Sequence, residues 1–385
     1  MKKIIVIKGK SQYDALRMFA DQVVHFMQNK GVEVDILDLN EENAKIINVL
    51  SRHVGTKVDA VFSFNAVGID LNVNNMPVSD LLNTKFYAFL VDHPMIHIER
   101  IRHLVKELVV SVIDYNHARY IRKHIDNVSE VYMISHGGMM SDNIKAYVDR
   151  NIDVLFTGTY IDPKSILMCF DNLADSAKNV ALGVIKTMLN DSTLSEEEAM
   201  ICLFKNYGLD ELLDSVPKWM ENLPEIDMYV RAYRRDALIR SLVEAGIKVN
   251  VYGNGWDKFK CEQQENLVIG PAIDYIKSLE LMGDSKIVLN IMPEFKRGSH
   301  ERVFCAMLNK AVCLTDRSSY NVAHFEDGKD IVFYDVDNLQ ELPNIVKDLL
   351  NNPDRAMQIA ENGYVNASKY HTWENRVTQI LETLE

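Results

Sequence analysis

The chain alternates short apolar runs with helical patterns in two separate stretches, and this limits the fold more than any other feature of its 385 residues. The first stretch predicts strands near residues 4–7, 32–39, 60–64, 86–91, 108–113, 131–134 and 154–156. The second begins after residue 227 and continues to about residue 334. Short apolar runs that alternate with helices are typical of parallel strands in a sheet covered on both faces. The sequence therefore predicts an α/β protein with two doubly wound, Rossmann-like domains.

The segment between the two stretches carries no strand signal. Residues 165–189 and 195–207 have helical patterns, and Ser195 followed by Glu198 resembles a capping box. A chain of this length is also too long for one compact domain. We therefore expect an N-terminal domain over residues 1–162, a helical insert over 163–228, a second domain over 229–370, and a final helix over 371–385 that returns towards the N-terminal domain.

Composition is that of an ordinary globular protein, with 47% hydrophobic and 25% charged residues. The formal net charge of −13 argues against wrapping a nucleic acid, which needs a broad basic surface. No apolar run approaches the roughly 18 residues of a membrane span. The five cysteines lack zinc or redox spacing and indicate reduced thiols. We expect a cytoplasmic protein without a membrane span, and the sequence leaves its oligomeric state open.

A glycine-rich turn follows the predicted strand over residues 249–252. It consists of Gly253, Asn254, Gly255 and Trp256. Two glycines after a strand permit positive φ and leave room for a ligand. Trp256 can line that pocket or pack in the core. The turn is therefore a candidate for binding a phosphorylated nucleotide, and a tight turn with a core tryptophan is the alternative.

A second candidate segment lies at the predicted start of a helix. It consists of Gly298, Ser299, His300, Glu301 and Arg302. A diphosphate requires backbone N–H groups at a helix N-terminus and a cation, and Arg302 offers a planar fork for phosphate. Asn290, near the end of the preceding strand, either faces this pocket or is buried and internally bonded. The alternative for the segment is an ordinary capped helix with a surface arginine.

Three candidates for catalysis follow strands of the first domain. Asp92 and His93 come directly after one predicted strand, and His136 after another. Pro94 favours an extended conformation for His93. His and Asp are suited to act as a general base towards a hydroxyl group. Each of the three could instead line a cleft or contact an acceptor.

Two short patterns in the chain do not indicate a binding site. Asp335 and Asp337 form a D-x-D pattern, but they lie past a late strand and indicate a solvated loop, so we expect no metal site. Residues 8–11 lack the second glycine and the spacing of a phosphate loop.

From residue 155 onward several segments match the pattern of a known family. They are residues 156–160, 229–231, 251–256, 302–304, 315–316, 327–334 and 371–373, with weaker matches at 61–65 and 91–94. In these segments the chain resembles GT-B glycosyltransferases and, more closely, looks like the CgeB-like (spore maturation protein type) family with its group-1-like C-terminal domain. The resemblance implies a GT-B fold with two domains that face a cleft.

The resemblance also implies a hexosyltransferase-type enzyme. It would transfer a sugar from a nucleotide diphosphate sugar, with UDP-sugars favoured, to a hydroxyl group of a protein or glycan. The second domain would bind the donor and the first the acceptor. No metal ion or cofactor is expected besides the nucleotide sugar, and retention of configuration is favoured. The alternatives are a non-catalytic GT-B-like binding subunit of a glycosylation complex and a sugar-nucleotide epimerase.

One departure from the family pattern concerns the donor ribose. Cys305 occupies the position at which the family usually has a glutamate that binds the ribose. Asn309 and Lys310 stand where a glycine is usual. The two alternatives are that Glu301 takes over the ribose contact and that recognition of the donor differs.

Overall fold

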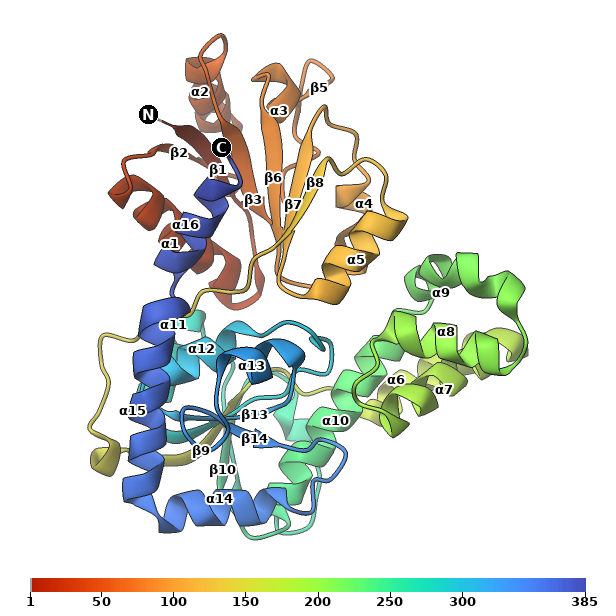
Figure 1. Cartoon of the computed structure of the whole chain (residues 1–385), viewed down its shortest axis with the longest axis vertical. Helices are drawn as coiled ribbons and strands as arrows, with labels where there is room; N and C mark the ends of the chain where they lie inside the picture. The colour runs from red at the N-terminus through yellow and green to blue at the C-terminus, as the bar shows by residue number, and fades with distance from the viewer. Residues whose placement is uncertain (1) are drawn as a thin grey trace. The chain divides into compact units, whose positions relative to one another are not determined.

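The computed structural model describes residues 2–385, which divide into two compact units. Unit 1 comprises Met1–Gly138 and Tyr370–Glu385, and unit 2 comprises Met139–Lys369. Each unit is built on its own six-stranded parallel sheet with flanking helices (Figure 1). The predicted α/β class with two Rossmann-like domains is therefore confirmed.

The sheet of unit 1 has the strand order β2-β1-β3-β6-β7-β8, and all neighbouring strands are parallel. The strands are β1 (Lys3–Lys8), β2 (Glu33–Asp38), β3 (Ala60–Phe64), β6 (Lys85–Leu90), β7 (Leu108–Val112) and β8 (Glu130–Met133). The chain first adds β2 on one side of β1 and then returns to add β3 on the other. The order therefore reverses between β1 and β3, and such a switch point is where doubly wound sheets bind ligands.

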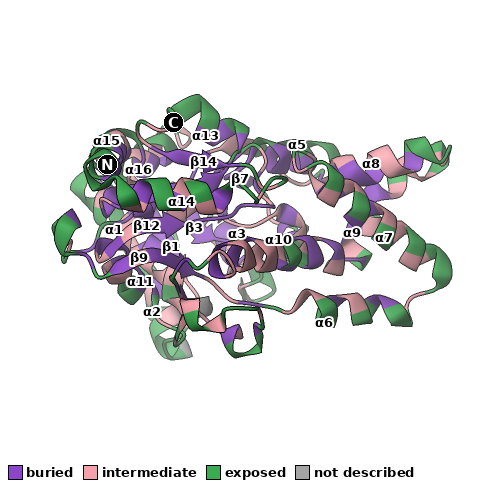
Figure 2. Cartoon of the chain, turned by 90° about the horizontal axis from the view of Figure 1, so that it is seen from below, coloured by how far each residue is buried: buried purple, intermediate pink, exposed green. Residues whose placement is uncertain are grey.

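The helices of unit 1 bury one face against this sheet. They are α1 (Ala15–Asn29), α2 (Asn43–His53), α3 (Val78–Leu81), α4 (Ile98–Ile101), α5 (Tyr115–His124) and α16 (Trp373–Glu382), beside a small hairpin of β4 (Asn72–Val73) and β5 (Met76–Pro77). In α1 the buried apolar residues recur at helical spacing, and Gly31 with a φ of 78° follows the end of the helix. Central strands such as β1 and β3 are buried, whereas helices such as α2 carry exposed faces (Figure 2).

Helix α16 supplies the largest side chain in the core of unit 1. Trp373 is 0% exposed. Its ring centroid lies 5.3 Å from that of Phe19, 5.6 Å from that of Phe64 and 6.0 Å from that of Phe89. A Cβ on Gly137 would lie 2.6 Å from the backbone nitrogen of Trp373, so only glycine permits this packing. The end of the chain therefore completes the core that its beginning starts.

The sheet of unit 2 has the order β11-β10-β9-β12-β13-β14, again with parallel neighbours. The strands are β9 (Ile152–Thr157), β10 (Val249–Tyr252), β11 (Leu267–Gly270), β12 (Ser285–Leu289), β13 (Val312–Asp316) and β14 (Val332–Tyr334). The helices that accompany them are α10 (Glu225–Val243), α11 (Tyr275–Gly283), α12 (Glu301–Leu308), α13 (Ser319–His324), α14 (Leu342–Asn351) and α15 (Pro353–Tyr370). The order reverses between β9 and β12, which is the switch point of this unit.

The structure corrects the expected domain boundary at residue 162. β9 is the seventh predicted strand of the chain, but it pairs with β10 and β12 of unit 2. Its residues 154 and 155 are bonded on both sides within that sheet, so β9 is a central strand there. Residues 139–162 therefore belong to unit 2, and the boundary falls after Gly138.

A helical segment interrupts unit 2 between β9 and α10. It consists of α6 (Pro163–Leu167), α7 (Asp175–Asn190), α8 (Glu196–Asn206) and α9 (Val216–Asn222), and α6 and α7 contact α10 (green in Figure 1). The long helix predicted over residues 165–189 is broken between α6 and α7 by a 3-10 turn. The predicted capping box is confirmed, since Ser195 Oγ accepts the Glu198 N–H and the Glu198 carboxylate accepts the Ser195 N–H. Among residues 2–385, no helix combines the length and apolarity that crossing a bilayer requires.

Replacing Trp373 by Ala should destabilise unit 1 by about 3–5 kcal/mol, because it removes a fully buried aromatic side chain and leaves a cavity. Urea unfolding of the full chain, followed by far-UV circular dichroism, measures this change. The control is Leu104→Ala at a position that is 77% exposed, where about 0.5 kcal/mol or less is expected. An unchanged midpoint in Trp373→Ala would refute a core role for α16.

Candidate functional site

Arg302 lies at the switch point of unit 2. β9 ends at Thr157, and Asn290 directly follows the end of β12. Arg302 Nε donates a hydrogen bond to Thr157 Oγ1 over 3.2 Å, and Nη1 donates to Asn290 Oδ1 over 2.7 Å. The guanidinium therefore bridges the carboxyl ends of the two strands between which the sheet order reverses, the position at which such sheets bind ligands.

Asn290 is itself fixed by hydrogen bonds and so orients Arg302. Its side chain is fully buried, and its Nδ2 donates to Thr315 Oγ1 over 2.9 Å. Its backbone carbonyl accepts a hydrogen bond from the Tyr334 hydroxyl over 2.7 Å. With its amide satisfied on both sides, Asn290 is the buried, internally bonded residue that the sequence analysis named as the alternative.

The N-terminus of α12 carries a cap, an acid and a cation within three residues. His300 caps the helix, since its Nδ1 accepts the backbone N–H of Arg302 over 3.2 Å. Glu301 Oε2 lies 2.5 Å from the same Nδ1. A helix N-terminus presents unpaired N–H groups and a partial positive charge, which favour an anion. We call Thr157, Asn290, His300, Glu301 and Arg302 the Arg302 site.

The residues before α12 are fixed from within unit 2. Ser318, the cap of α13, donates from its Oγ to the Gly298 carbonyl over 2.6 Å. Ser299 is 0% exposed, and no described residue forms a hydrogen bond with its hydroxyl. The helix start predicted from the sequence is thus present, with Gly298 and Ser299 buried beneath it.

The glycine turn after β10 packs against the chain itself. Gly253 has a φ of 143°, and a Cβ on it would lie 2.4 Å from the Gly158 carbonyl oxygen. Gly255 has a φ of 84°, and a Cβ there would lie 2.2 Å from the Tyr160 carbonyl oxygen. Residues 158–160 fill the space in which a ligand was expected. They can approach the turn this closely because Gly253 and Gly255 have no side chains.

Trp256 is a core residue. It is 1% exposed, and its Nε1 donates to the Gly158 carbonyl over 2.8 Å. Its ring packs against those of Phe156 and Tyr160, with centroids 5.8 and 5.1 Å apart. Because the ring is buried, neither of its faces can contact a ligand. This corrects the expected role of Trp256 as a pocket residue. Asn254 is exposed, and its carbonyl accepts the Tyr160 N–H over 2.8 Å.

Cys305 is a buried, neutral anchor. Its Sγ lies 3.2 Å from the Tyr275 hydroxyl oxygen and accepts the Met139 N–H over 3.3 Å. Burial raises the pKa of its thiol to about 12, so the thiol stays protonated at neutral pH. Asn309, one turn later, donates to the Met139 carbonyl and accepts the Ser141 N–H. The positions that depart from the family pattern therefore hold the first residues of unit 2 against α12.

Sequence reasoning gave no role to Asp316, the last residue of β13. The residue is 6% exposed, and its carboxylate accepts the Met292 N–H over 2.9 Å, which orients the loop from β12 towards α12. Burial raises the pKa of Asp316 to about 6, against the opposing charge of Lys296. Its position at the end of a buried strand was the available signal.

In unit 1, Asp92 lies in a polar cluster at the end of β6. Asp92 Oδ2 accepts a hydrogen bond from Asn65 Nδ2 over 2.9 Å and lies 3.1 Å from His97 Nε2. The Asp92 side chain is 45% exposed and can therefore meet a ligand. His93 caps the next 3-10 turn, with its Nδ1 accepting the Met95 N–H. Sequence reasoning missed His97, five positions after Asp92. We call Asn65, Asp92, His93 and His97 the Asp92 cluster.

His136 does not join this cluster. It is 3% exposed, and its ring packs against Phe19 and Trp373, with centroids 5.3 and 6.0 Å away. Its backbone carbonyl accepts a hydrogen bond from Arg376 Nε over 2.7 Å. His136 therefore belongs to the core of unit 1, and its burial argues against the catalytic role expected from its position after a strand.

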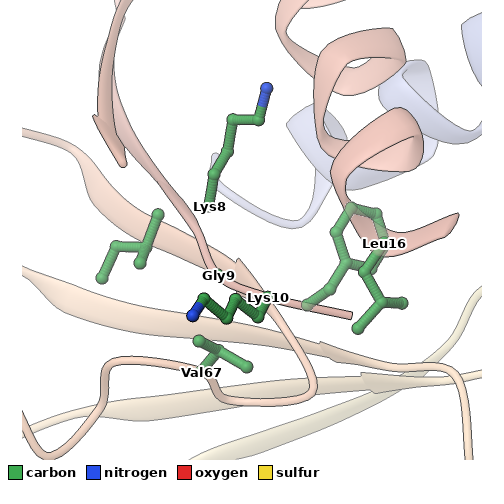
Figure 3. A pocket seen from close by; sticks show the side chains of 7 residues that line it. Lys8, Gly9, Lys10, Leu16 and Val67 are labelled. Carbon is green, nitrogen blue, oxygen red and sulfur yellow. The ribbon is translucent and has the colours of Figure 1, made fainter. Parts of the chain in front are cut away.

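A small pocket opens at the switch point of unit 1 (Figure 3). It is lined by Ile7, Lys8, Gly9, Lys10, Leu16, Phe64 and Val67. Lys8 is paired with Asp21 at 2.5 Å. A Cβ on Gly9 would meet a methyl group of Val67 at 2.5 Å, so a larger residue at position 9 would push into the wall of this pocket.

The D-x-D pattern has internal partners. Asp337 accepts hydrogen bonds from Arg234 Nη2 over 3.2 Å and from the Ser192 N–H over 3.3 Å. Asp335 accepts the Asp337 N–H over 2.9 Å. Over the described residues 2–385, no group of three or more His, Cys, Asp or Glu side chains is arranged to hold a metal ion.

The buried carboxyl of Asp316 generates a pH-dependent prediction. Because its folded pKa of about 6 lies above the ordinary 3.8, its contribution to stability is full below pH 3.8 and is lost as pH rises to about 6. The loss is about 3 kcal/mol, at 1.36 kcal/mol per pKa unit. Asp316→Asn lacks this titrating group and should not show the loss. Between pH 4 and 6.5, its free energy of unfolding should therefore rise by that amount relative to that of the parent. Denaturant titrations at several pH values measure the difference, and exposed Asp214→Asn is the control. A pH-independent difference would refute the raised pKa.

The family profile described as glycosyl transferase-like matches residues 234–382. This range contains the Arg302 site except for Thr157. A comparison with curated protein sequences finds no significant match.

Three solved structures are similar to the chain over 100% of its length. HepE from Anabaena, in complex with UDP-glucose, has 10% identity, 99% coverage and a TM-score of 0.55. Sucrose-phosphate synthase from Thermosynechococcus elongatus has 9% identity, 98% coverage and a TM-score of 0.55. A T4 phage BGT mutant in complex with UDP-glucose has 12% identity, 99% coverage and a TM-score of 0.56. The chain therefore has the GT-B fold, and its residues 234–382 are similar to the glycosyl transferase-like family.

Proposed function

We propose that the chain is a glycosyltransferase that transfers a sugar from a nucleoside diphosphate sugar to an acceptor hydroxyl. The observation that carries the proposal is the Arg302 guanidinium, held by Thr157 and Asn290 at the switch point of unit 2 and beside the N-terminus of α12. The match to the glycosyl transferase-like profile over residues 234–382 supports it. Within this proposal the chain is of the CgeB-like type that its motifs resemble.

The chemistry assigned to unit 2 is stabilisation of the leaving group. When the bond between the anomeric carbon and the diphosphate oxygen breaks, negative charge builds up on the diphosphate. A fixed guanidinium and the N–H groups at a helix N-terminus stabilise such a charge without reorganising. Arg302 uses Nε and Nη1 within the protein, so we assign Nη2 to a phosphate oxygen. The proposal includes no metal ion.

The donor we favour is a UDP-hexose. Two of the similar structures, HepE and BGT, hold UDP-glucose, which supports uridine as the base and a hexose as the transferred group. Glu301 takes the ribose contact in this proposal, because Cys305, at the usual position, is a buried thiol that bonds within unit 2.

The acceptor side is assigned to unit 1. Asp92 is the candidate that receives the proton of the acceptor hydroxyl as the new bond to the anomeric carbon forms, with His97 beside it at 3.1 Å. We propose a protein or a glycan as the acceptor and retention of configuration, both by analogy with the family. We also place the enzyme in the cytoplasm, since all five cysteines are free thiols, as is usual in a reducing compartment.

A non-catalytic binding subunit is the second candidate, and the observation that favours it is Cys305. A carboxylate that the family uses for the ribose is replaced by a thiol that serves packing. A sugar-nucleotide epimerase remains the third. Product analysis after incubation with single donors separates the three, because only a transferase releases the nucleoside diphosphate and only an epimerase converts the donor itself.

A thermal-shift assay tests the donor site. It uses UDP, GDP, CDP, dTDP and the corresponding nucleotide sugars, each with and without divalent metal. UDP and UDP-glucose should raise the melting temperature of the full chain without added metal, because a ligand that binds only the folded state stabilises it. Arg302→Gln should weaken UDP binding by about 10- to 100-fold, since a charged hydrogen bond is lost.

The matched control for that experiment is Arg355→Gln, an exposed arginine on α15, which should leave binding unchanged. The absence of a shift with every nucleotide would refute the donor site. A shift that requires metal would refute the metal-independent mechanism.

Asp92→Asn should lower kcat by about 100-fold or more while the KM for the donor stays near that of the parent, because a base acts only on the acceptor proton. Steady-state assays of UDP release with a working acceptor measure both constants. Asp80→Asn, a residue of α3 outside the cluster, is the control. A fall in kcat below tenfold would show that Asp92 does not act as the base.

A further inference from the structure

We propose that Arg235 of α10 is a second donor-contacting residue, and that its guanidinium and that of Arg302 each hold one phosphate of a nucleoside diphosphate near Phe156. This inference rests on the proposed function and adds a residue to the same site. Sequence reasoning did not single out Arg235, because it is one of several arginines along α10 and no motif contains it.

The two guanidinium groups share one aromatic ring. The Cζ atoms of Arg235 and Arg302 each lie 5.6 Å from the centroid of the Phe156 ring. Both are also anchored to the end of β9, Arg302 through Thr157 Oγ1 and Arg235 through the Thr159 carbonyl. Two elements that are 67 positions apart in the chain, counted from residue 235 to residue 302, thus bring two positive charges to the same strand end.

Gly158 leaves space at this strand end. Its φ of 155° is in the region that favours glycine, and a Cβ on it would lie 3.3 Å from the Phe156 ring and 3.9 Å from Arg235 Cζ. The backbone between Thr157 and Thr159 therefore carries no side chain beside the two arginines.

The charge of Arg235 is poorly compensated within unit 2. Its Nε is buried, and no described residue accepts a hydrogen bond from it. Burial, followed by the charge of Arg302, lowers the pKa of Arg235 to about 10, and Glu294 opposes this fall. Arg235 therefore stays charged at neutral pH. An unpaired, buried donor beside a like charge is costly, and an anion that accepts from both arginines removes that cost.

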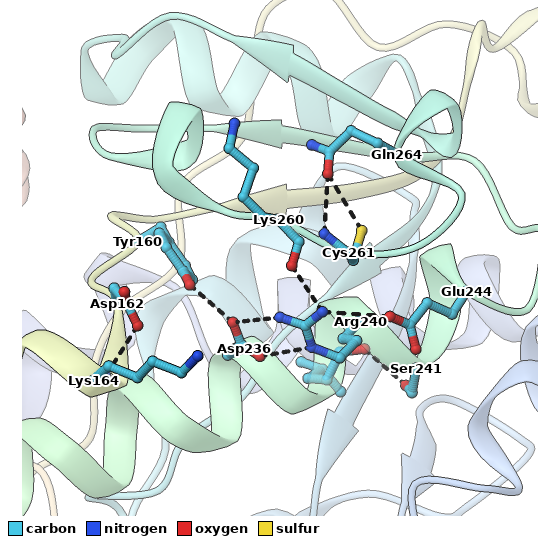
Figure 4. A network of polar contacts seen from close by, with 11 residues as sticks. Tyr160, Asp162, Lys164, Asp236, Arg240, Ser241, Glu244, Lys260, Cys261 and Gln264 are labelled. Atoms are coloured by element: carbon cyan, nitrogen blue, oxygen red, sulfur yellow. Dashed lines mark hydrogen bonds and ion pairs between the residues drawn. The ribbon is translucent and has the colours of Figure 1, made fainter.

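Arg240, on the same helix, is an arginine with a structural role and serves as a comparison for Arg235. It also lies over an aromatic ring, with its Cζ 5.0 Å from the Phe259 centroid. Its side chain bonds to Asp236 over 3.0 and 3.1 Å and to Glu244 over 3.3 Å, as the network in Figure 4 shows. Arg240 is thus neutralised by two carboxylates, whereas no carboxylate is hydrogen-bonded to Arg235 among the residues described. This difference points to an external anion for Arg235.

A diphosphate fits two cations better than a single phosphate does. Each of the two phosphates can accept hydrogen bonds from one guanidinium, and the charge-assisted bonds add. A nucleoside monophosphate offers only one such group. Arg235 should therefore matter most for nucleoside diphosphates and least for the nucleoside.

The test compares Arg235→Gln and Arg235→Lys in the full chain, with Arg240→Gln as the matched control. Calorimetry measures binding of UDP, UMP and uridine, with GDP, CDP and dTDP and their nucleosides used if UDP does not bind the parent. Arg235→Gln should weaken nucleoside diphosphate binding by about 10- to 100-fold and leave the nucleoside unchanged. Arg235→Lys, which keeps the charge, should recover part of the loss. Arg240→Gln should not alter the ratio of the two affinities.

Each outcome decides a different point. Equal weakening for the diphosphate and the nucleoside would mean that Arg235 only supports the Thr159 turn, and would overturn the inference. Unchanged diphosphate binding in Arg235→Gln, with loss in Arg302→Gln, would overturn the inference and leave the proposed function standing. A parent that binds no nucleoside diphosphate would overturn both. If Arg235→Gln does not fold, Arg235→Lys decides. A ratio of diphosphate to nucleoside affinity that equals that of the parent, and that does not change when the salt concentration is raised, would count against a phosphate contact.

Discussion

The hydrogen bonds of Arg302 to Thr157 and Asn290 are the interaction on which the proposed site depends. Asn290 is in turn bonded to Thr315 and Tyr334, so one buried network links the ends of β9, β12, β13 and β14. A polar network that is satisfied throughout is rigid, because each missing bond would leave a buried group unpaired. The guanidinium is thereby oriented before any ligand arrives, which is the condition under which electrostatic stabilisation of a leaving group is effective.

The glycine turn contributes to this arrangement indirectly. Gly253 and Gly255 let the β10 turn approach residues 158–160, and Trp256 donates to the Gly158 carbonyl from within the core. The segment that receives these contacts is the one that anchors Arg235 and follows Thr157. What looked like a ligand pocket is therefore the support of the strand end on which two arginines meet.

Local patterns of the sequence predicted what depends on neighbouring residues. The strands, the capping box at Ser195 and the helix start just before Arg302 follow from spacing and composition within a few positions. The assignment of residues 154–156 to the first domain failed because strand pairing is non-local, and β9 finds its partners in later residues. Likewise, the burial of His136 depends on Trp373, more than two hundred positions away. Arg235 could not be predicted, since its meaning comes only from Phe156 and Arg302 in space.

The insertion of Trp373 into the first core has a consequence for the order in which the two units form during synthesis. Unit 2 is one continuous segment, and its sheet is complete once β14 has emerged from the ribosome. Unit 1 is made first but lacks its central tryptophan until translation has passed residue 373. Its aromatic residues Phe19, Phe64 and Phe89 are therefore left incompletely covered while the whole of unit 2 is being made, a period in which a nascent chain with exposed apolar surface depends on chaperones.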